Sequence, residues 1–200
     1  MLRNRGLSQR ALTALAVVAT LAPFAMAGNV QGAVQSTVDG KRVTGAVVYI
    51  ASVPGKFKAP EKPVLMDQKD KTFVPDTLAI MVGTTVRFLN SDPFLHNVYA
   101  NSRLFKFNIS QPDKGKYSDV TFDKFGVVAV RCHIHAAMKG YIAVLDNPFF
   151  AVTDKSGLFK IPDVPAGSYT LKVWTPTGST DESITVGATG NTTILLKVKT

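Results

Sequence analysis

The sequence predicts an all-β protein built from sandwiches of antiparallel strands. Short runs rich in Val, Ile, Thr and aromatic residues recur along the chain, and stretches with turn chemistry ("VDGK", "DKSG", "VPAG", "TPTG") separate them. No long stretch shows apolar residues at helical spacing. Many short strands at this spacing are typical of β-sandwiches.

The expected strands fall into two groups along the chain. The first group comprises 45–51, 78–81, 85–90, 118–122, 126–132 and 140–145, and the second comprises 149–153, 157–161, 169–174, 182–186 and 192–199. Residues 52–63 hold three prolines and no apolar period, so we expect a linker or surface loop there.

The first 27 residues have the layout of a secretory signal peptide. A start with three arginines precedes an apolar run at 11–24, and "AMA" at 25–27 supplies a small-residue cleavage signal before Gly28. The alternative is an uncleaved membrane anchor, which Pro23 within the apolar run disfavours. No other segment is long enough to cross a membrane. We therefore expect a periplasmic or secreted protein without a membrane span after removal of the signal.

The charge of the mature chain excludes nucleic acid as a partner. From residue 28 onward the chain has 20 basic and 14 acidic residues, a net charge of +6. The lysines are scattered and form no dense run, whereas a nucleic-acid site needs a concentrated basic patch. The net positive charge still favours, weakly, a protein partner with an acidic surface.

The stretch "RCHIHAAMKG" at 131–140 indicates a metal site. Cys132 is the only cysteine, so it forms no internal disulfide, and strand alternation turns it to the same side as the core valines before it. His135 and Met138 follow at Cys-x2-His-x2-Met in a tight loop, and His96 is the histidine left over to supply a fourth donor. One thiolate, two imidazoles and a weak thioether are the donor set of a blue copper site. Zinc is the alternative, although its usual ligand sets contain no thioether.

Residues 73–145 resemble cupredoxins of the plastocyanin and amicyanin type, blue copper proteins that include those of methylamine utilisation. The resemblance rests on "HNV" at 96–98 and on the Cys-x2-His-x2-Met loop, whose length is that of amicyanin. It implies one copper per chain with His96, Cys132 and His135 as equatorial ligands and Met138 as the axial ligand. It also implies that Asn97 ties the two ligand loops together.

One residue departs from the resemblance. His133 follows Cys132 directly, and we interpret it as an exposed loop residue; a competing ligand is the minority interpretation.

The resemblance implies a one-electron carrier rather than an enzyme, and we find no nucleophile paired with a base. The expected partner is a redox protein with an acidic surface, such as a cytochrome or a dehydrogenase. His135 should lie nearest to solvent, within an apolar patch formed by Pro93, Phe94, Leu95, Ala136 and Ala137 and rimmed by Lys139, Lys124 and Lys106. The alternatives are a copper-binding or copper-delivery protein and a binding module without a redox function.

A second resemblance concerns the rest of the chain. Residues 149–176 are similar to carboxypeptidase regulatory-like, transthyretin-like β-sandwiches, through "TDKSGLF" and "VPAGSYTLKV". The opening strand and turn of such a domain appear only at the mature amino end. We therefore predict a split sandwich, formed by 28–51 with 148–200, into which a cupredoxin of 52–147 is inserted. The alternative is one enlarged cupredoxin with an amino-terminal strand and a carboxy-terminal appendage.

Overall fold

The computed structural model describes residues 26–200, and this part of the chain is all-β, as predicted. The strands are β1 (Ala27–Ser36), β2 (Val47–Ile50), β3 (Val64–Lys69), β4 (Thr72–Val74), β5 (Thr77–Met81), β6 (Thr84–Asn90), β7 (His96–Asn101), β8 (Lys106–Gln111), β9 (Tyr117–Phe122), β10 (Gly126–Arg131), β11 (Lys139–Leu145), β12 (Phe150–Val152), β13 (Leu158–Pro165), β14 (Gly167–Thr175), β15 (Gly178–Val186) and β16 (Asn191–Val198). The expected signal segment lies outside the described residues except for its last two, and Ala27 already begins β1. Within 26–200, no helix is long and apolar enough to span a membrane.

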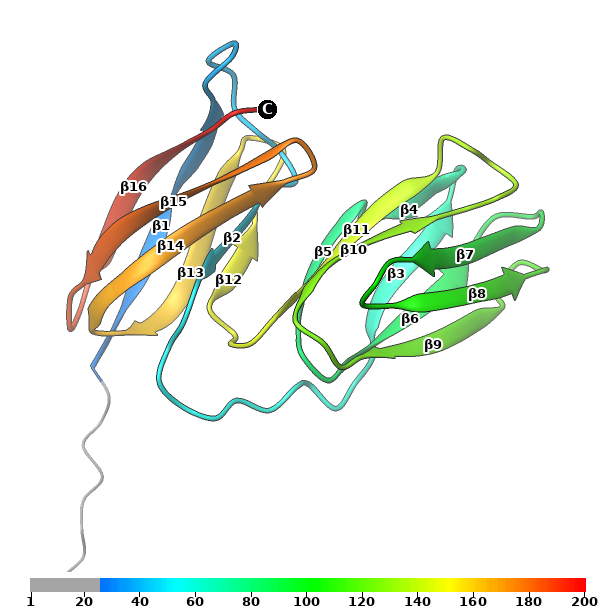
Figure 1. The fold of residues 1–200 in the computed structure, drawn as a ribbon, viewed down its shortest axis with the longest axis horizontal. Coiled ribbons are helices and arrows are strands. Elements are labelled where there is room, and N and C mark those ends of the chain that lie inside the picture. The colour runs from blue at the N-terminus through cyan, green and yellow to red at the C-terminus, as the bar shows by residue number, and fades with distance from the viewer. Residues whose placement is uncertain (1–25) are drawn as a thin grey trace, which may run out of the picture.

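The two ends of the described chain form one sandwich together, which we call the host sandwich (Figure 1). Its two sheets have the strand orders β13-β1-β16 and β12-β2-β14-β15. β1 runs antiparallel to β13 and parallel to β16, and β2 runs antiparallel to β12 and β14. The expected strand at 45–51 therefore pairs with strands from 149–200, as an insertion requires. The fully buried side chains of its core include Val30, Val48, Ile161, Leu171 and Leu196.

Strands β3 to β11 form a second sandwich, which we call the inserted sandwich. Its sheets have the orders β5-β11-β10-β7-β8 and β4-β3-β6-β9. This is a cupredoxin-like β-sandwich, and its core is separate from that of the host sandwich. The buried side chains of this second core include Phe73, Phe88, Phe122, Val128, Val130 and Ile142.

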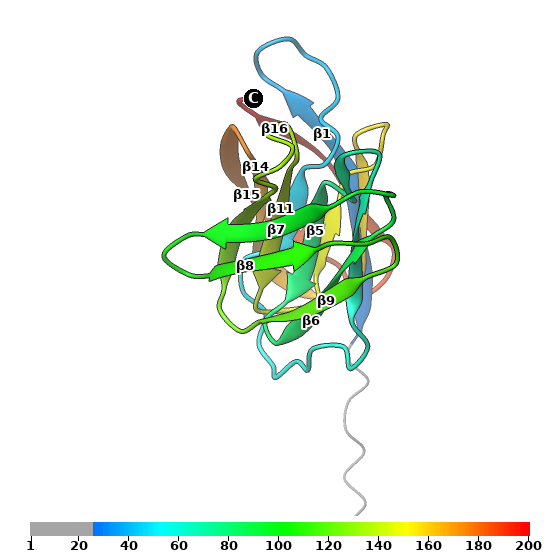
Figure 2. The same cartoon turned by 90° about the vertical axis from the view of Figure 1, so that its right-hand side faces the viewer.

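The two sandwiches pack against each other through one apolar layer. Val47 of β2 lies with Ala143 and Leu145 of β11 in a buried cluster. Trp174 of β14 meets Tyr141 of β11 edge to face, with ring centroids 5.3 Å apart. Figure 2 shows β7 and β8 on the side of the inserted sandwich that faces away from this contact. β11, the strand that follows the Cys-x2-His-x2-Met loop, therefore packs on the core of the inserted sandwich with one face and on the host sandwich with the other.

Each expected strand overlaps an observed one, and 52–63 contains no strand, as predicted for a loop. Strands β3, β4, β7 and β8 were not expected. β7 opens with His96 and Asn97, and β8 exposes polar side chains at alternate positions, so neither has the apolar run from which strands were inferred. Cys132 lies one residue beyond β10 rather than inside it.

Candidate metal centre

Two strands place His96 and Cys132 at the same end of one sheet. β7 begins at His96, and β10 ends one residue before Cys132; the two strands are antiparallel neighbours. Val128 and Val130 of β10 are fully buried, and the same alternation turns Cys132 inward, where it is 3% exposed. The lone thiol of the chain is therefore shielded from solvent.

The loop from Cys132 to Met138 closes on itself. The N–H of Cys132 donates to the carbonyl of Met138 at 3.3 Å, and the N–H of Met138 donates to the carbonyl of His135 at 2.8 Å. Met138 is 1% exposed and belongs to the same apolar cluster as Cys132. The loop thus brings a sulfur, a nitrogen and a second sulfur to the end of β10.

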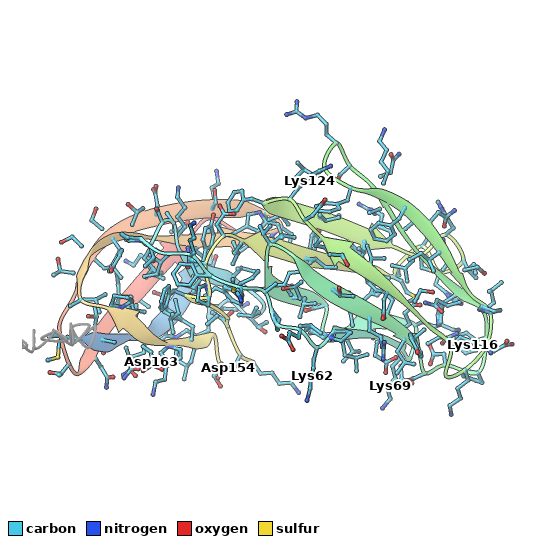
Figure 3. The ribbon with its side chains drawn as sticks, turned by 90° about the horizontal axis from the view of Figure 1, so that it is seen from below. Lys62, Lys69, Lys116, Lys124, Asp154 and Asp163 are labelled. Atoms are coloured by element: carbon cyan, nitrogen blue, oxygen red, sulfur yellow. The ribbon has the colours of Figure 1, made fainter. Side chains whose placement is uncertain are left out.

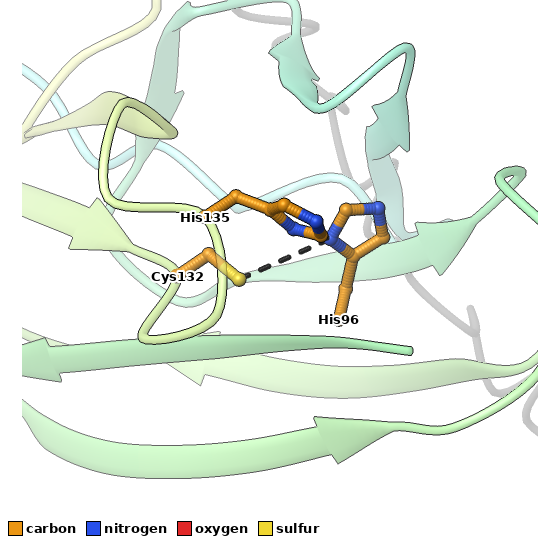
Figure 4. Close-up of side chains that lie close together, drawn as sticks. All are labelled: His96, Cys132 and His135. Carbon is orange, nitrogen blue, oxygen red and sulfur yellow. Dashed lines mark hydrogen bonds between the residues drawn. The ribbon is translucent and has the colours of Figure 1, made fainter. Parts of the chain in front are cut away.

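The donor atoms of His96, Cys132 and His135 all lie within 4.8 Å of one another. His96 Nδ1 is 3.1 Å from His135 Nδ1 and 3.9 Å from Cys132 Sγ (Figure 4). Two nitrogens each about 2.0 Å from one metal ion are at most about 4.0 Å apart. A sulfur about 2.3 Å and a nitrogen about 2.0 Å from one ion are at most about 4.3 Å apart. Both separations from His96 are therefore short enough for one metal ion held by two imidazoles and a thiolate.

Phe94 covers the two imidazoles from the solvent side. Its ring centroid lies 5.2 Å from that of His96 and 5.5 Å from that of His135. His96 has no exposed surface, whereas His135 is only partly buried and Phe94 is exposed. His135 is thus the nitrogen donor nearest to solvent, as expected.

Asp92, a residue that sequence reasoning missed, fixes the tautomer of His96. Its Oδ2 lies 2.8 Å from His96 Nε2, and both side chains are buried. With Nε2–H donating to the carboxylate, the lone pair of Nδ1 is directed toward Cys132 and His135. The signal available in the sequence was the carboxylate four residues before the histidine, in "DPFLH" at 92–96.

The same carboxylate ties His96 to the hairpin between β3 and β4. Asp92 accepts the backbone N–H groups of Asp70 and Lys71 at 2.8 and 3.0 Å. Both turn residues have positive φ, 53° and 56°, which is the conformation of a two-residue type I′ hairpin turn. Burial raises the pKa of the Asp92 carboxyl, but the hydrogen bonds from Lys71, His96 and Asp70 outweigh burial and hold this pKa below its usual value.

Asn97 joins the two ligand-bearing loops, as the resemblance implied. Its Oδ1 accepts the backbone N–H of His133 at 2.6 Å. Its Nδ2 donates to Asn108 Oδ1 at 2.6 Å. Asn108 thus orients the amide so that its oxygen, and not its nitrogen, points toward the ligand loop. Asn108 was not predicted, because nothing in the sequence shows that β8 lies beside β7.

Asn90 supports the loop that carries Phe94 and Asp92. Its Oδ1 accepts the N–H of Asp92 at 2.9 Å. Its Nδ2 donates to the carbonyls of Phe94 at 2.9 Å and Gln111 at 3.0 Å. Asn90 is fully buried, so these hydrogen bonds anchor the loop before His96 to the interior of the sandwich.

The electrostatic surroundings of His135 favour its neutral form. Its partial burial, the neighbouring His96 and the ammonium of Lys71 lower the pKa of His135 below its usual value, and Asp92 opposes them. Lys71 Nζ lies 5.3 Å from the centre of the Phe94 ring, at this same end of the molecule. A neutral imidazole is the form that binds metal.

The predicted apolar patch is exposed, but two lysines of its predicted rim lie elsewhere. Lys124 follows β9 and precedes β10, at the opposite end of β10 from Cys132, and Figure 3 shows it apart from Lys69 and Lys116. Lys106 pairs with Asn101, at the end of β7 opposite His96. The prediction failed because position in the sequence does not reveal at which end of a strand a turn lies.

His133 is exposed, as predicted, and lies outside the donor cluster. Its ring stacks on that of Tyr99, with centroids 3.6 Å apart and an angle of 3° between the planes. The donor cluster of the described chain thus contains two histidines and one cysteine.

Comparisons with known proteins give local likenesses to each half of this architecture. The sequence model described as Polysaccharide lyase family 4, domain II matches residues 142–194, which lie mostly in the host sandwich. No curated protein matches the chain in sequence.

Among solved structures, a copper-containing nitrite reductase from Thermus scotoductus SA-01 is similar at 30% identity over 49% of this chain and 25% of that chain, with a TM-score of 0.39. A purple cupredoxin from Nitrosopumilus maritimus is similar at 29% identity over 38% of this chain and 83% of that one, with a TM-score of 0.34. An amicyanin variant in its Cu(I) form is similar at 22% identity over 41% of this chain and 81% of that one, with a TM-score of 0.38. The chain spans a quarter of the nitrite reductase and most of the two cupredoxins.

The strand order and the donor set lead to one description of the molecule. A soft thiolate with two imidazoles in a buried, nearly closed cluster is the equatorial set of a type 1 copper site. The chain therefore combines a cupredoxin-like sandwich, with a His–Cys–His cluster suited to type 1 copper, and a second β-sandwich formed by its two ends.

Proposed function

We propose that the protein is an exported one-electron carrier that binds one copper ion through His96, Cys132 and His135, with Met138 as the axial ligand. Copper supplies reversible one-electron chemistry when it is bound in such a site. The observation that carries the proposal is the convergence of the three equatorial donor atoms, which all lie within 4.8 Å of one another at a buried end of one sheet.

The surrounding hydrogen bonds support electron transfer rather than loose copper storage. Asp92 holds the ring of His96, and Asn97 holds the backbone next to Cys132. Ligands that are fixed in this way keep the same geometry in both oxidation states, so little reorganisation accompanies electron transfer. A site built to release copper needs ligands that move apart.

An apolar surface next to His135 supports docking of a redox partner there. The exposed residues of this surface are Pro93, Phe94, Leu95, Ala136 and Ala137. His135 is the partly exposed ligand at its centre. We propose a partner protein with an acidic surface, since the mature chain carries a net charge of +6. Export to the periplasm or the medium remains our proposal from the first 27 residues.

We further propose that residues 52–147 form a unit inserted into a host sandwich of 28–51 and 148–200. The N–H of Ile50 donates to the carbonyl of Phe149 at 3.0 Å, and Asn147 Nδ2 donates to the carbonyl of Ile50 at 2.9 Å. Hydrogen bonds therefore join the two points at which the insert would leave the host sandwich and return to it. A chain in which a short Gly-Ser turn replaces the insert should keep a cooperative β-sheet unfolding transition; loss of that transition would contradict the proposal.

Protein-film voltammetry of the copper-loaded mature chain tests the electron-carrier function. The proposal predicts a reversible wave of one electron per chain that persists over repeated cycles. Loss of copper to a Cu(I) chelator on reduction, with disappearance of the wave, would favour a copper-delivery protein instead.

A further inference from the structure

The outer face of the sheet β5-β11-β10-β7-β8 is divided into two parts. The host sandwich covers the apolar part, around Ala143 and Leu145 of β11. The cover ends at Tyr141, whose ring meets Trp174 of the host sandwich. Beyond Tyr141, toward the ligand loop, the same face is open, and β7 and β8 lie on its free side (Figure 2).

Four strands contribute one side chain each to a row across this open part. Lys139 of β11 lies opposite Arg131 of β10, Arg131 lies opposite Tyr99 of β7, and Tyr99 lies opposite Asn108 of β8. Facing residues of neighbouring strands share a face of the sheet. Lys139 Nζ lies 4.9 Å from the centre of the Tyr141 ring, which confirms that the row is on the side of the host sandwich.

The cations of this face have no acidic partner. Arg131, Lys139 and Lys106 are exposed, and none of them forms a salt bridge among residues 26–200. This contrasts with Arg87 on the opposite sheet, which Asp119 neutralises through two hydrogen bonds. The open face therefore carries uncompensated positive charge.

A flat aromatic platform lies among these cations. It is the stack of His133 on Tyr99, and with Lys106 and Asn108 these residues line an open pocket of about 430 Å³. His133 is covalently joined to Cys132, and its N–H is fixed by Asn97. The platform thus contains the residue that follows Cys132 in the chain, and none of the residues of the apolar patch at His135 lines its pocket.

We propose that this open face, formed by Lys139, Arg131, Tyr99, His133 and Lys106, is a second docking surface for a protein with a cluster of carboxylates. Carboxylates of the partner pair with Arg131 and Lys139, and a planar side chain packs on the His133–Tyr99 stack. The proposal rests on the proposed electron-carrier function, because docking there places the partner next to the Cys132 ligand.

Two anionic probes test the surface on the full mature chain, first without metal and then with Cu(I). Paramagnetic hexacyanochromate(III), added to ¹⁵N-labelled protein, should broaden the backbone amides of Arg131, His133, Lys139 and Tyr99 before all others. A hexaglutamate peptide should shift the same amides, and added salt should reverse the shifts.

Charge removal supplies the matched comparison. Arg131→Gln with Lys139→Gln should weaken hexaglutamate binding about tenfold, the loss expected from two exposed ion pairs. The control, Lys155→Gln with Lys197→Gln, removes the same charge from exposed sites on the host sandwich and should leave the affinity within about twofold of the parent.

Broadening centred on Lys71 and His135, or spread over all lysines, would overturn the proposal, as would equal weakening by both double variants. Because the metal-free chain reports on the surface, failure of the surface is distinguishable from failure of the copper function, which voltammetry measures separately.

Discussion

Replacing Asp92 with alanine removes the carboxylate that accepts His96 Nε2–H and two backbone N–H groups. His96 is completely buried, so its N–H is left without an acceptor, at a cost of about 1–3 kcal/mol. Asp70 and Lys71 lie in an exposed turn, where water replaces the lost acceptor. The loss of their two hydrogen bonds therefore lowers the free energy of unfolding by about 1 kcal/mol. We expect the free energy of unfolding of the metal-free protein to fall by about 2–4 kcal/mol.

Urea denaturation followed by far-UV circular dichroism measures this change, with Asp123→Ala as the control because that carboxylate is exposed in the turn between β9 and β10. A competition assay with a Cu(I) chelator should also show a loss of about 10–100-fold in copper affinity for Asp92→Ala. If Asp92→Ala and Asp123→Ala were equally stable and bound copper equally well, the reasoning about the His96 tautomer would be wrong.

Three further predictions concern side chains around the cluster. Met138→Leu should keep copper and raise the reduction potential in voltammetry, because a weak axial donor to Cu(II) is lost; a lower potential would argue against Met138 as the axial ligand. His133→Ala should leave the visible spectrum of the copper form nearly unchanged, since His133 lies outside the donor cluster; loss of the colour would make it a ligand. Lys71→Met should raise the pKa of His135 toward its usual value in NMR titrations of the metal-free protein, because a neighbouring positive charge is removed. The control Lys69→Met should not do so.

The pH dependence of metal-free stability follows from the same shift. Because the pKa of His135 is lowered on folding, the unfolded chain binds the proton more readily. The contribution of His135 to the free energy of unfolding of the metal-free protein is therefore complete above the unfolded pKa of about 6.5. It is lost as the pH falls below that value.

The cluster of His96, Cys132 and His135 was predictable from the sequence because soft metal donors are rare in this chain. A single cysteine and three histidines leave few ways to assemble a soft metal site, and the alternation of Val128, Val130 and Cys132 indicates the direction of the thiol. The pairing of strands from the two ends of the chain was also predictable, since a turn and strand pattern missing at one end of the chain was present at the other.

The supporting residues were not predictable, because their roles depend on pairing across the sheet. Asp92 is one of many carboxylates until its contact with His96 and the β3–β4 turn is seen. Asn108 becomes relevant only because β8 pairs with β7, and Lys124 was misplaced because the end of the strand at which it lies was unknown. Sequence patterns indicate which face of a strand is buried, whereas register and neighbour order come from the folded chain.

The visible absorption spectrum of the mature protein loaded with Cu(II) tests the central claim most directly. Charge transfer from the Cys132 thiolate should give an intense blue band, and Cys132→Ser should abolish it, because a hydroxyl oxygen cannot supply the thiolate-to-copper transition. A colourless or weakly absorbing copper complex of the parent chain, or an unchanged spectrum of Cys132→Ser, would contradict the assignment of a type 1 copper site.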